Sequence, residues 1–130
     1  MNEPLWISEQ IVRFIHDCQI QQHGGSLGIR DENLLSASLA RPRHLFAYTQ
    51  PSLFELAAAY GYGLAKNHPF IDGNKRTAFM VMYVFLGLNR YLLEVPDREV
   101  VQMMERLATD EETQEDLAQW LEKNSVYRVE

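Results

Sequence analysis

Asn74-Lys-Arg-Thr-Ala-Phe-Met-Val-Met-Tyr-Val-Phe-Leu-Gly-Leu-Asn89 is the stretch that decides how this 130-residue chain folds. Its first turn is polar and the remainder is apolar on almost every side, which is typical of a helix enclosed by other helices. The apolar run from Ala78 to Leu88 is well short of the roughly 20 residues that a helix needs to cross a bilayer. The stretch therefore predicts a central helix in a buried core.

Helix-capping residues predict two further helices on the N-terminal side. Ser8 precedes apolar residues that recur at three- and four-residue spacing, and Gly24 with Gly25 is expected to end that helix. Asp31 is placed to cap a second helix, which we expect to end near Arg41 because the proline that follows disfavours continuation. The link between the two helices is rich in glycine and predicts turns.

The same signals predict helices toward the C-terminus. Ser52 and Glu55 form a capping box for a third helix that runs to about Lys66. Thr113 and Asp116 start a last helix in the same way.

The whole pattern predicts an all-α fold, a compact bundle of about six helices in one domain over residues 1–130. A short extended piece over residues 91–95 precedes a helix over about 96–107. Hydrophobic residues make up 46% of the chain and charged residues 23%, a balance that argues against both disorder and a membrane protein. The formal net charge of −6 gives no long-range attraction for nucleic acid, so any phosphate binding has to be local. The N-terminus lacks a signal peptide and Cys18 has no disulfide partner in the chain, so we expect a cytoplasmic protein.

The link before the central helix carries an unusual density of reactive groups: His68-Pro-Phe-Ile-Asp-Gly-Asn-Lys-Arg76. Free backbone N–H groups near Gly73, Asn74 and Lys75 face outward at the positive end of the helix dipole, which makes a natural anion site. Gly73 lets an anion approach the backbone, Lys75 adds a point charge, and Arg76 offers a planar fork for phosphate oxygens.

Three other residues of this link are predicted to complete a phosphate-transfer site. Asp72 would repel phosphate unless a cation bridged them, so it is the predicted Mg²⁺ ligand. His68, when neutral, is the candidate general base. Phe70 is expected to anchor the loop in the core. Taken singly, each residue has a structural explanation as a cap or a solvated first turn; it is their joint occurrence at one helix N-terminus that favours a site.

Residues 42–51 show no clean helical period, and we interpret them as a loop with apolar contacts to make. Its apolar side chains Leu45, Phe46 and Tyr48 suggest a protein-binding surface or packing on the bundle.

The run His68 to Thr77 resembles the signature of the Fic/Doc family, and within it the death-on-curing (Doc) branch of toxins from toxin–antitoxin systems. The resemblance extends to Gly24–Asp31, to residues 39–42 and to the apolar helix after Thr77. It implies a Fic/Doc-type helical bundle with the motif loop between two core helices. It also implies roles: His68 as catalytic base, Asp72 as Mg²⁺ ligand, Gly73 with Asn74 as phosphate cradle, and Arg76 as phosphate clamp. Residues 42–51 are similar in position to the flap that aligns an extended target segment, so Leu45, Phe46 and Tyr48 are the predicted flap residues.

Two departures from the common Fic pattern bear on the reaction. Most Fic enzymes carry glycine where this chain has Lys75, and a second arginine where it has Phe79, and they transfer AMP from ATP to a protein hydroxyl. Doc-type toxins share the Asn-Lys-Arg form and act as protein kinases with the nucleotide reversed. The resemblance therefore implies transfer of the γ-phosphate of ATP to a hydroxyl, with Thr of elongation factor Tu as the family's known target. AMP transfer and a non-catalytic binding module remain the alternatives.

The Fic family also suggests how such an enzyme is restrained. Many members carry an inhibitory helix with a Ser/Thr-x-x-x-Glu-Gly or -Asn pattern, which this chain lacks. We therefore expect restraint by a separate, Phd-like antitoxin whose tail folds on binding; a modifier with no restraining partner is the alternative. No membrane or direct nucleic-acid partner is expected.

Overall fold

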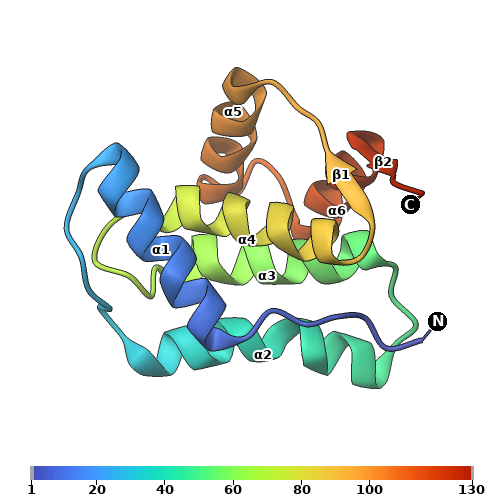
Figure 1. Cartoon of the computed structure of the whole chain (residues 1–130), viewed down its shortest axis with the longest axis horizontal. Helices are drawn as coiled ribbons and strands as arrows, with labels where there is room; N and C mark the ends of the chain where they lie inside the picture. Colours follow the sequence, from blue (N-terminus) through green and yellow to red (C-terminus); the bar gives the residue numbers. More distant parts are fainter. Residues whose placement is uncertain (1, 130) are drawn as a thin grey trace.

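The computed structural model describes residues 2–129, which form a bundle of helices with one small two-stranded sheet (Figure 1). The elements in chain order are α1 (Glu9–His23), α2 (Glu32–Tyr48), α3 (Leu53–Asn67), α4 (Asn74–Leu88), β1 (Tyr91–Leu93), α5 (Asp97–Ala108), α6 (Gln114–Lys123) and β2 (Ser125–Tyr127). The predicted all-α fold class is confirmed.

The helices begin where their capping residues predicted. The Ser8 hydroxyl accepts the N–H of Ile11 at 3.2 Å, and the Asp31 carboxylate accepts the N–H of Leu34 at 3.0 Å. The capping boxes that open α3 and α6 are both formed. Local signals therefore fixed the starts of these four helices.

Helix α3 is the most enclosed helix of the bundle. It lies between α2 and α4 and also contacts α5 and α6 (Figure 1). Small residues allow this close packing: a Cβ on Gly61 would overlap the Met82 side chain, and one on Gly63 would lie 2.8 Å from Arg41 Cδ. The predicted central helix, α4, belongs to the core but keeps Phe79 and Met80 only partly buried. The predicted placing of α4 in the core is confirmed, and α3 shares the centre of the bundle with it, because the small residues of α3 admit neighbours on more sides.

Helix α2 continues through Pro42 to Tyr48, so the predicted end near Arg41 and the predicted loop over residues 42–51 are wrong. A proline inside a helix removes one backbone hydrogen bond and usually kinks or ends it. Here tertiary contacts offset that loss: Pro42 is buried, the Arg41 guanidinium lies over the Tyr62 ring, and Arg43 lies over Trp6. Only residues 49–52 link α2 to α3.

Segments near both ends of the described residues meet at the turn after α4. Leu5 exchanges backbone hydrogen bonds with the Asn89 side chain at 2.9 and 3.0 Å, and the N–H of Arg128 donates to the Arg90 carbonyl at 2.7 Å. Nearby, β1 and β2 pair antiparallel with Leu92 opposite Val126. Strand β1 falls within the predicted extended piece, whereas β2 was not predicted. None of the helices formed by residues 2–129 is long and apolar enough to span a bilayer.

Candidate active site

The motif loop, residues 68–73, joins the two core helices at one end of the bundle (Figure 1). It starts and ends on left-handed backbone: His68 is the C-cap of α3 with φ 49°, and Gly73 is the N-cap of α4 with φ 75°. Glycine adopts this conformation freely, whereas for His68 it costs roughly 1–2 kcal/mol. The loop has a buried middle and exposed flanks, because Pro69 and Phe70 are buried while His68 and Asp72 are exposed.

Phe70, predicted to anchor the loop, is 1% exposed and stacks on the ring of His16, with 3.9 Å between the ring centroids and 6° between the planes. His16 Nε2 lies 2.8 Å from the carbonyl oxygen of Asp72. A carbonyl only accepts, so this nitrogen carries the proton and donates. The buried His16 therefore contacts the motif loop at two residues, Phe70 and Asp72. Sequence analysis missed His16, because a histidine on the buried face of α1 gives no signal beyond helical spacing.

Asn74 closes the loop on itself rather than facing a ligand with its side chain. Its Oδ1 accepts the N–H of Phe70 at 2.9 Å and its Nδ2 donates to the Phe70 carbonyl at 3.0 Å. The Asn74 side chain is buried and engaged at both ends, so its predicted part in the phosphate cradle is restricted to its backbone N–H.

The N-terminus of α4 has no side-chain cap among the described residues, and no acidic residue lies in its first turn. Its first intrahelical bond runs from the N–H of Thr77 to the carbonyl of Gly73 at 3.0 Å. The backbone amides of Asn74, Lys75 and Arg76 therefore remain as donors at the positive end of the helix dipole, an arrangement that binds anions.

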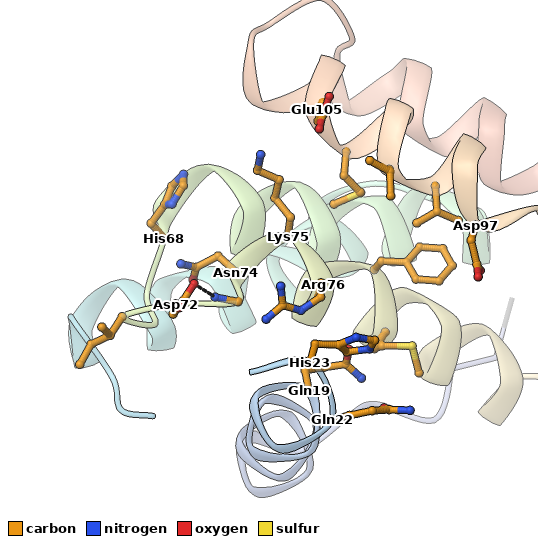
Figure 2. A pocket seen from close by; sticks show the side chains of 17 residues that line it. Gln19, Gln22, His23, His68, Asp72, Asn74, Lys75, Arg76, Asp97 and Glu105 are labelled. Atoms are coloured by element: carbon orange, nitrogen blue, oxygen red, sulfur yellow. Dashed lines mark hydrogen bonds between the residues drawn. The ribbon is translucent and has the colours of Figure 1, made fainter. Parts of the chain in front are cut away.

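This helix end opens into a cleft of about 910 Å³ between α1, α4 and α5 (Figure 2). The cleft brings together the predicted site residues His68, Asp72, Gly73, Asn74, Lys75 and Arg76. Its remaining lining comes from the polar C-terminal part of α1 and from apolar side chains: Gln19, Gln22, His23, Ile71, Phe79, Met80, Asp97, Val100, Val101, Met104 and Glu105. A volume of this order accommodates a nucleotide-sized ligand.

The two cations of the motif take different directions from the helix end. Figure 2 shows the Lys75 side chain extending from α4 toward α5, where Glu105 lines the cleft. Arg76 extends instead toward α1, where its Nη2 donates to the Gly24 carbonyl at 3.1 Å. Four of the five guanidinium N–H groups take no part in that bond, so Arg76 retains donors for an anion in the cleft.

Asp72 fits the chemistry of a magnesium ligand. Its Oδ1 accepts the N–H of Gly73 at 2.8 Å and its Oδ2 the N–H of Ser26 at 3.3 Å, which orients the carboxylate and leaves further lone pairs. Among residues 2–129 no group of three or more His, Cys, Asp or Glu is placed to hold a metal. Mg²⁺ is commonly held by one or two carboxylates together with water and substrate phosphates, so one carboxylate beside an anion site is sufficient.

The predicted flap does not lie at the site. Leu45, Phe46 and Tyr48 belong to the C-terminal part of α2, about 20 Å along the helix from its start beside the motif. Helical residues have their backbone groups paired within the helix, so they cannot align a target by strand-like pairing.

A different segment, residues 24–30, runs along the motif loop. The N–H of Ile71 donates to the Gly28 carbonyl at 3.1 Å, and Ile29 pairs with Phe70 as an isolated antiparallel bridge. Gly25 is needed for this approach, because a Cβ there would lie 2.5 Å from Asp72 Oδ2. The three glycines signalled turns, but the sequence did not indicate that the segment borders the site.

Fold and cleft together define a helical protein in which the loop between two core helices leads to an open helix N-terminus at a cleft. The chain belongs to the Fic/DOC family, whose model matches residues 6–86, more than half of the chain. The resemblance carried by the motif is thereby confirmed.

Two relatives narrow the similarity to the Doc branch. A protein named Toxin Doc from Mycolicibacterium smegmatis is 46% identical over 70 residues, which cover 51% of this chain and 52% of that protein. A protein named Protein kinase doc from Escherichia phage P1 is 36% identical over 84 residues, covering 64% of this chain and 67% of that protein. The chain thus spans about half the length of the first relative and two thirds of the second.

Proposed function

We propose that this protein is a Doc-like toxin that transfers the γ-phosphate of ATP to a hydroxyl of a target protein. The observation that carries the proposal is the uncapped N-terminus of α4, which opens into the cleft between Lys75 and Arg76 and is flanked by His68 and Asp72. The names of the two relatives support the same class of activity.

The reaction follows from these groups. The target hydroxyl oxygen attacks the γ-phosphorus, the bond from that phosphorus to the β–γ bridging oxygen breaks, and ADP leaves while His68 takes the hydroxyl proton. The backbone amides of α4 with Lys75 and Arg76 stabilise the charge on the transferring group. Mg²⁺, held by Asp72 and the phosphates, would neutralise further phosphate charge when bound.

Lys75 favours phosphate transfer over the alternative, AMP transfer. Its side chain lines the same cleft as His68 (Figure 2), so it places a positive charge in the cleft that holds the proposed base. That charge suits a terminal phosphoryl group, which carries more negative charge than the α-phosphate of ATP. A lysine at this position also fills space where a glycine would let a diphosphate approach the backbone.

Two protein partners belong to the proposal. The target is a protein with an accessible hydroxyl, and elongation factor Tu with its threonine is the candidate that the family resemblance supplies. An antitoxin on a separate chain is the expected source of restraint. We assign the target-aligning role to Leu27, which is 63% exposed, because it lies in the segment of residues 24–30 that borders the motif loop.

The test compares ATP labelled at the γ-phosphate with ATP labelled at the α-phosphate, each with Mg²⁺ and a bacterial lysate. We expect label from the γ-position alone on one protein, with the added mass of a single phosphate by intact-mass analysis. His68→Ala should abolish labelling, whereas His44→Ala, which removes an exposed histidine of α2, should not. Label from the α-position would establish AMP transfer instead, and absence of label from purified elongation factor Tu would remove that target.

A further inference from the structure

The left-handed backbone at His68 is held by a side chain that lies 38 positions away in the sequence. Arg30 Nε donates to the His68 carbonyl at 2.7 Å, and Arg30 Nη2 donates to the Asn67 carbonyl at 2.8 Å. These carbonyls close helix α3, whose last C=O groups have no partner within the helix. One guanidinium fork therefore binds two successive peptide groups.

These two peptide groups are the ones that flank the His68 Cα atom. The Asn67 carbonyl belongs to the peptide before it and the His68 carbonyl to the peptide after it. Fixing both planes fixes φ and ψ of His68, and with them the direction in which its Cβ leaves the backbone. Such control is needed here, because a helix that ends in left-handed backbone usually carries glycine at that position and His68 is not glycine.

Arg30 is itself attached to the loop that it holds. Its backbone N–H donates to the Pro69 carbonyl at 2.7 Å, and its neighbour Ile29 pairs with Phe70. Arg30 is not among the residues that line the cleft, and its two side-chain hydrogen bonds both go to backbone carbonyls. Its charge is therefore placed to act on the backbone of the motif rather than on a phosphate.

We propose that Arg30 is a positioning residue that directs the His68 imidazole into the cleft by clamping the peptide groups on either side of it. The inference rests on the proposed function for its kinetic consequence only. The backbone effect is independent of what the protein transfers.

The kinetic test compares Arg30→Ala with Arg30→Lys in the full chain. We expect kcat for phosphate transfer to fall by about 10- to 100-fold in Arg30→Ala, because displacing a reacting group by about 1 Å can cost on the order of 100-fold in rate. KM for ATP should stay within about twofold, since the groups that face phosphate are untouched. Lysine can satisfy only one of the two carbonyls, so kcat of Arg30→Lys should lie between the kcat of the unmodified protein and that of Arg30→Ala. Free guanidinium ion at low millimolar concentration should restore part of kcat in Arg30→Ala.

Arg13→Ala is the matched control, because Arg13 is a half-buried arginine of α1 that pairs with Glu9 and Glu32 and does not line the cleft. It should retain the kcat of the unmodified protein. A rise of KM for the target protein with unchanged kcat in Arg30→Ala would overturn the proposal, since it would mean that Arg30 contacts the target.

A second readout does not depend on transfer. The ¹³Cα and ¹³Cβ chemical shifts of His68 report its backbone torsions, and we expect them to leave the left-handed range in Arg30→Ala but not in Arg13→Ala. Unchanged shifts would overturn the inference whatever the activity. If the unmodified protein transferred no phosphate, the proposed function would fail while these shifts still decided the role of Arg30. If Arg30→Ala did not fold, the same comparison would be made with Arg30→Lys. Unchanged His68 chemical shifts and an unchanged kcat in that variant would overturn the inference.

Discussion

His68 and Gly73 lie at φ 49° and 75°, so the motif loop is bounded by two residues in a conformation that few side chains adopt. The residues that hold this loop, His16, Arg30 and Asn74, do so through bonds to its backbone. The motif residues were found in the sequence because they are adjacent and chemically distinctive. His16 and Arg30 were not found, because their contacts join residues 56 and 38 positions apart and nothing local marks them.

At this scale, replacing His16 should destabilise the fold and the loop together. His16→Leu removes the donor to the Asp72 carbonyl, and losing this partly buried hydrogen bond should cost about 0.5–1.5 kcal/mol. His16→Gln retains a donor of similar reach and should cost less. Urea unfolding measures both, with His44→Leu as a control at an exposed histidine. Equal stability of the leucine and glutamine variants would show that the hydrogen bond contributes nothing.

Among the helices and strands, elements whose signals are local were predicted and those decided by distant contacts were not. The starts of α1, α2, α3 and α6 follow from capping residues within four positions of the helix. The predicted end of α2 was wrong because Pro42 is a strong local signal for a helix end. The packing of Arg43 on Trp6 and of Arg41 on Tyr62 overrides that signal. Strand β2 was missed because its partner, β1, lies about 30 residues earlier and three residues carry no period of their own.

The packing of α3 against α4 predicts opposite effects for two glycine substitutions. In Gly61→Ala the new methyl group overlaps the fully buried Met82, and such overpacking costs about 1–3 kcal/mol. Gly87 in α4 has nothing within 4 Å of its would-be Cβ, so Gly87→Ala should stabilise the protein by up to about 1 kcal/mol through helix propensity. Thermal unfolding of the pair checks both signs. A stabilising Gly61→Ala would contradict the close approach of the two helices.

The extended segment over residues 24–30 predicts a change in target affinity without a change in nucleotide affinity. Leu27 is 63% exposed and Ile71 of the motif loop is 56% exposed, beside a backbone that pairs with the loop. Leu27→Ala should raise KM for the target protein several-fold and leave KM for ATP unchanged. Tyr48→Ala, at the far end of α2, should change neither. An effect at Tyr48 alone would return the target-aligning role to α2.

At the scale of the whole molecule, the chain before α1 crosses the bundle and contacts three helices. Trp6 packs against Phe46 of α2 and Phe85 of α4, and the N–H of Ile7 donates to the Tyr60 hydroxyl of α3 at 3.2 Å. This segment therefore joins three helices that the sequence alone gave no reason to connect. The class of fold was predictable from helical signals, but the order of packing around α3 was not, because it depends on which small residues face which neighbour.

Tyr60 predicts how the stability of the whole bundle depends on alkaline pH. Burial raises the pKa of Tyr60 above its usual value of 10.0, while its hydrogen bond to Ile7 and the charge of Arg43 act in the opposite direction. A raised pKa in the folded state means that the contribution of Tyr60 is complete below pH 10 and is lost as pH rises through the folded pKa. Tyr60→Phe should cost about 1 kcal/mol near neutral pH through the lost hydrogen bond to Ile7. It should also lose less stability than the unmodified protein between about pH 9 and about pH 11, as measured by urea unfolding. Parallel pH profiles for the two proteins would contradict the assignment.

Both described ends of the chain are fastened to neighbouring residues, Asn89 and Arg90, at the end of α4 that lies farthest from the motif. The length of α4 separates that point from the N-terminus of the helix, where the motif lies, by about 20 Å. A fluorescent protein, an affinity handle or a surface tether joined ahead of residue 2 or behind residue 129 would therefore emerge at the end of the bundle opposite the motif loop (Figure 1). The protein can thus be immobilised or imaged from either end with its cleft left open to nucleotide and target.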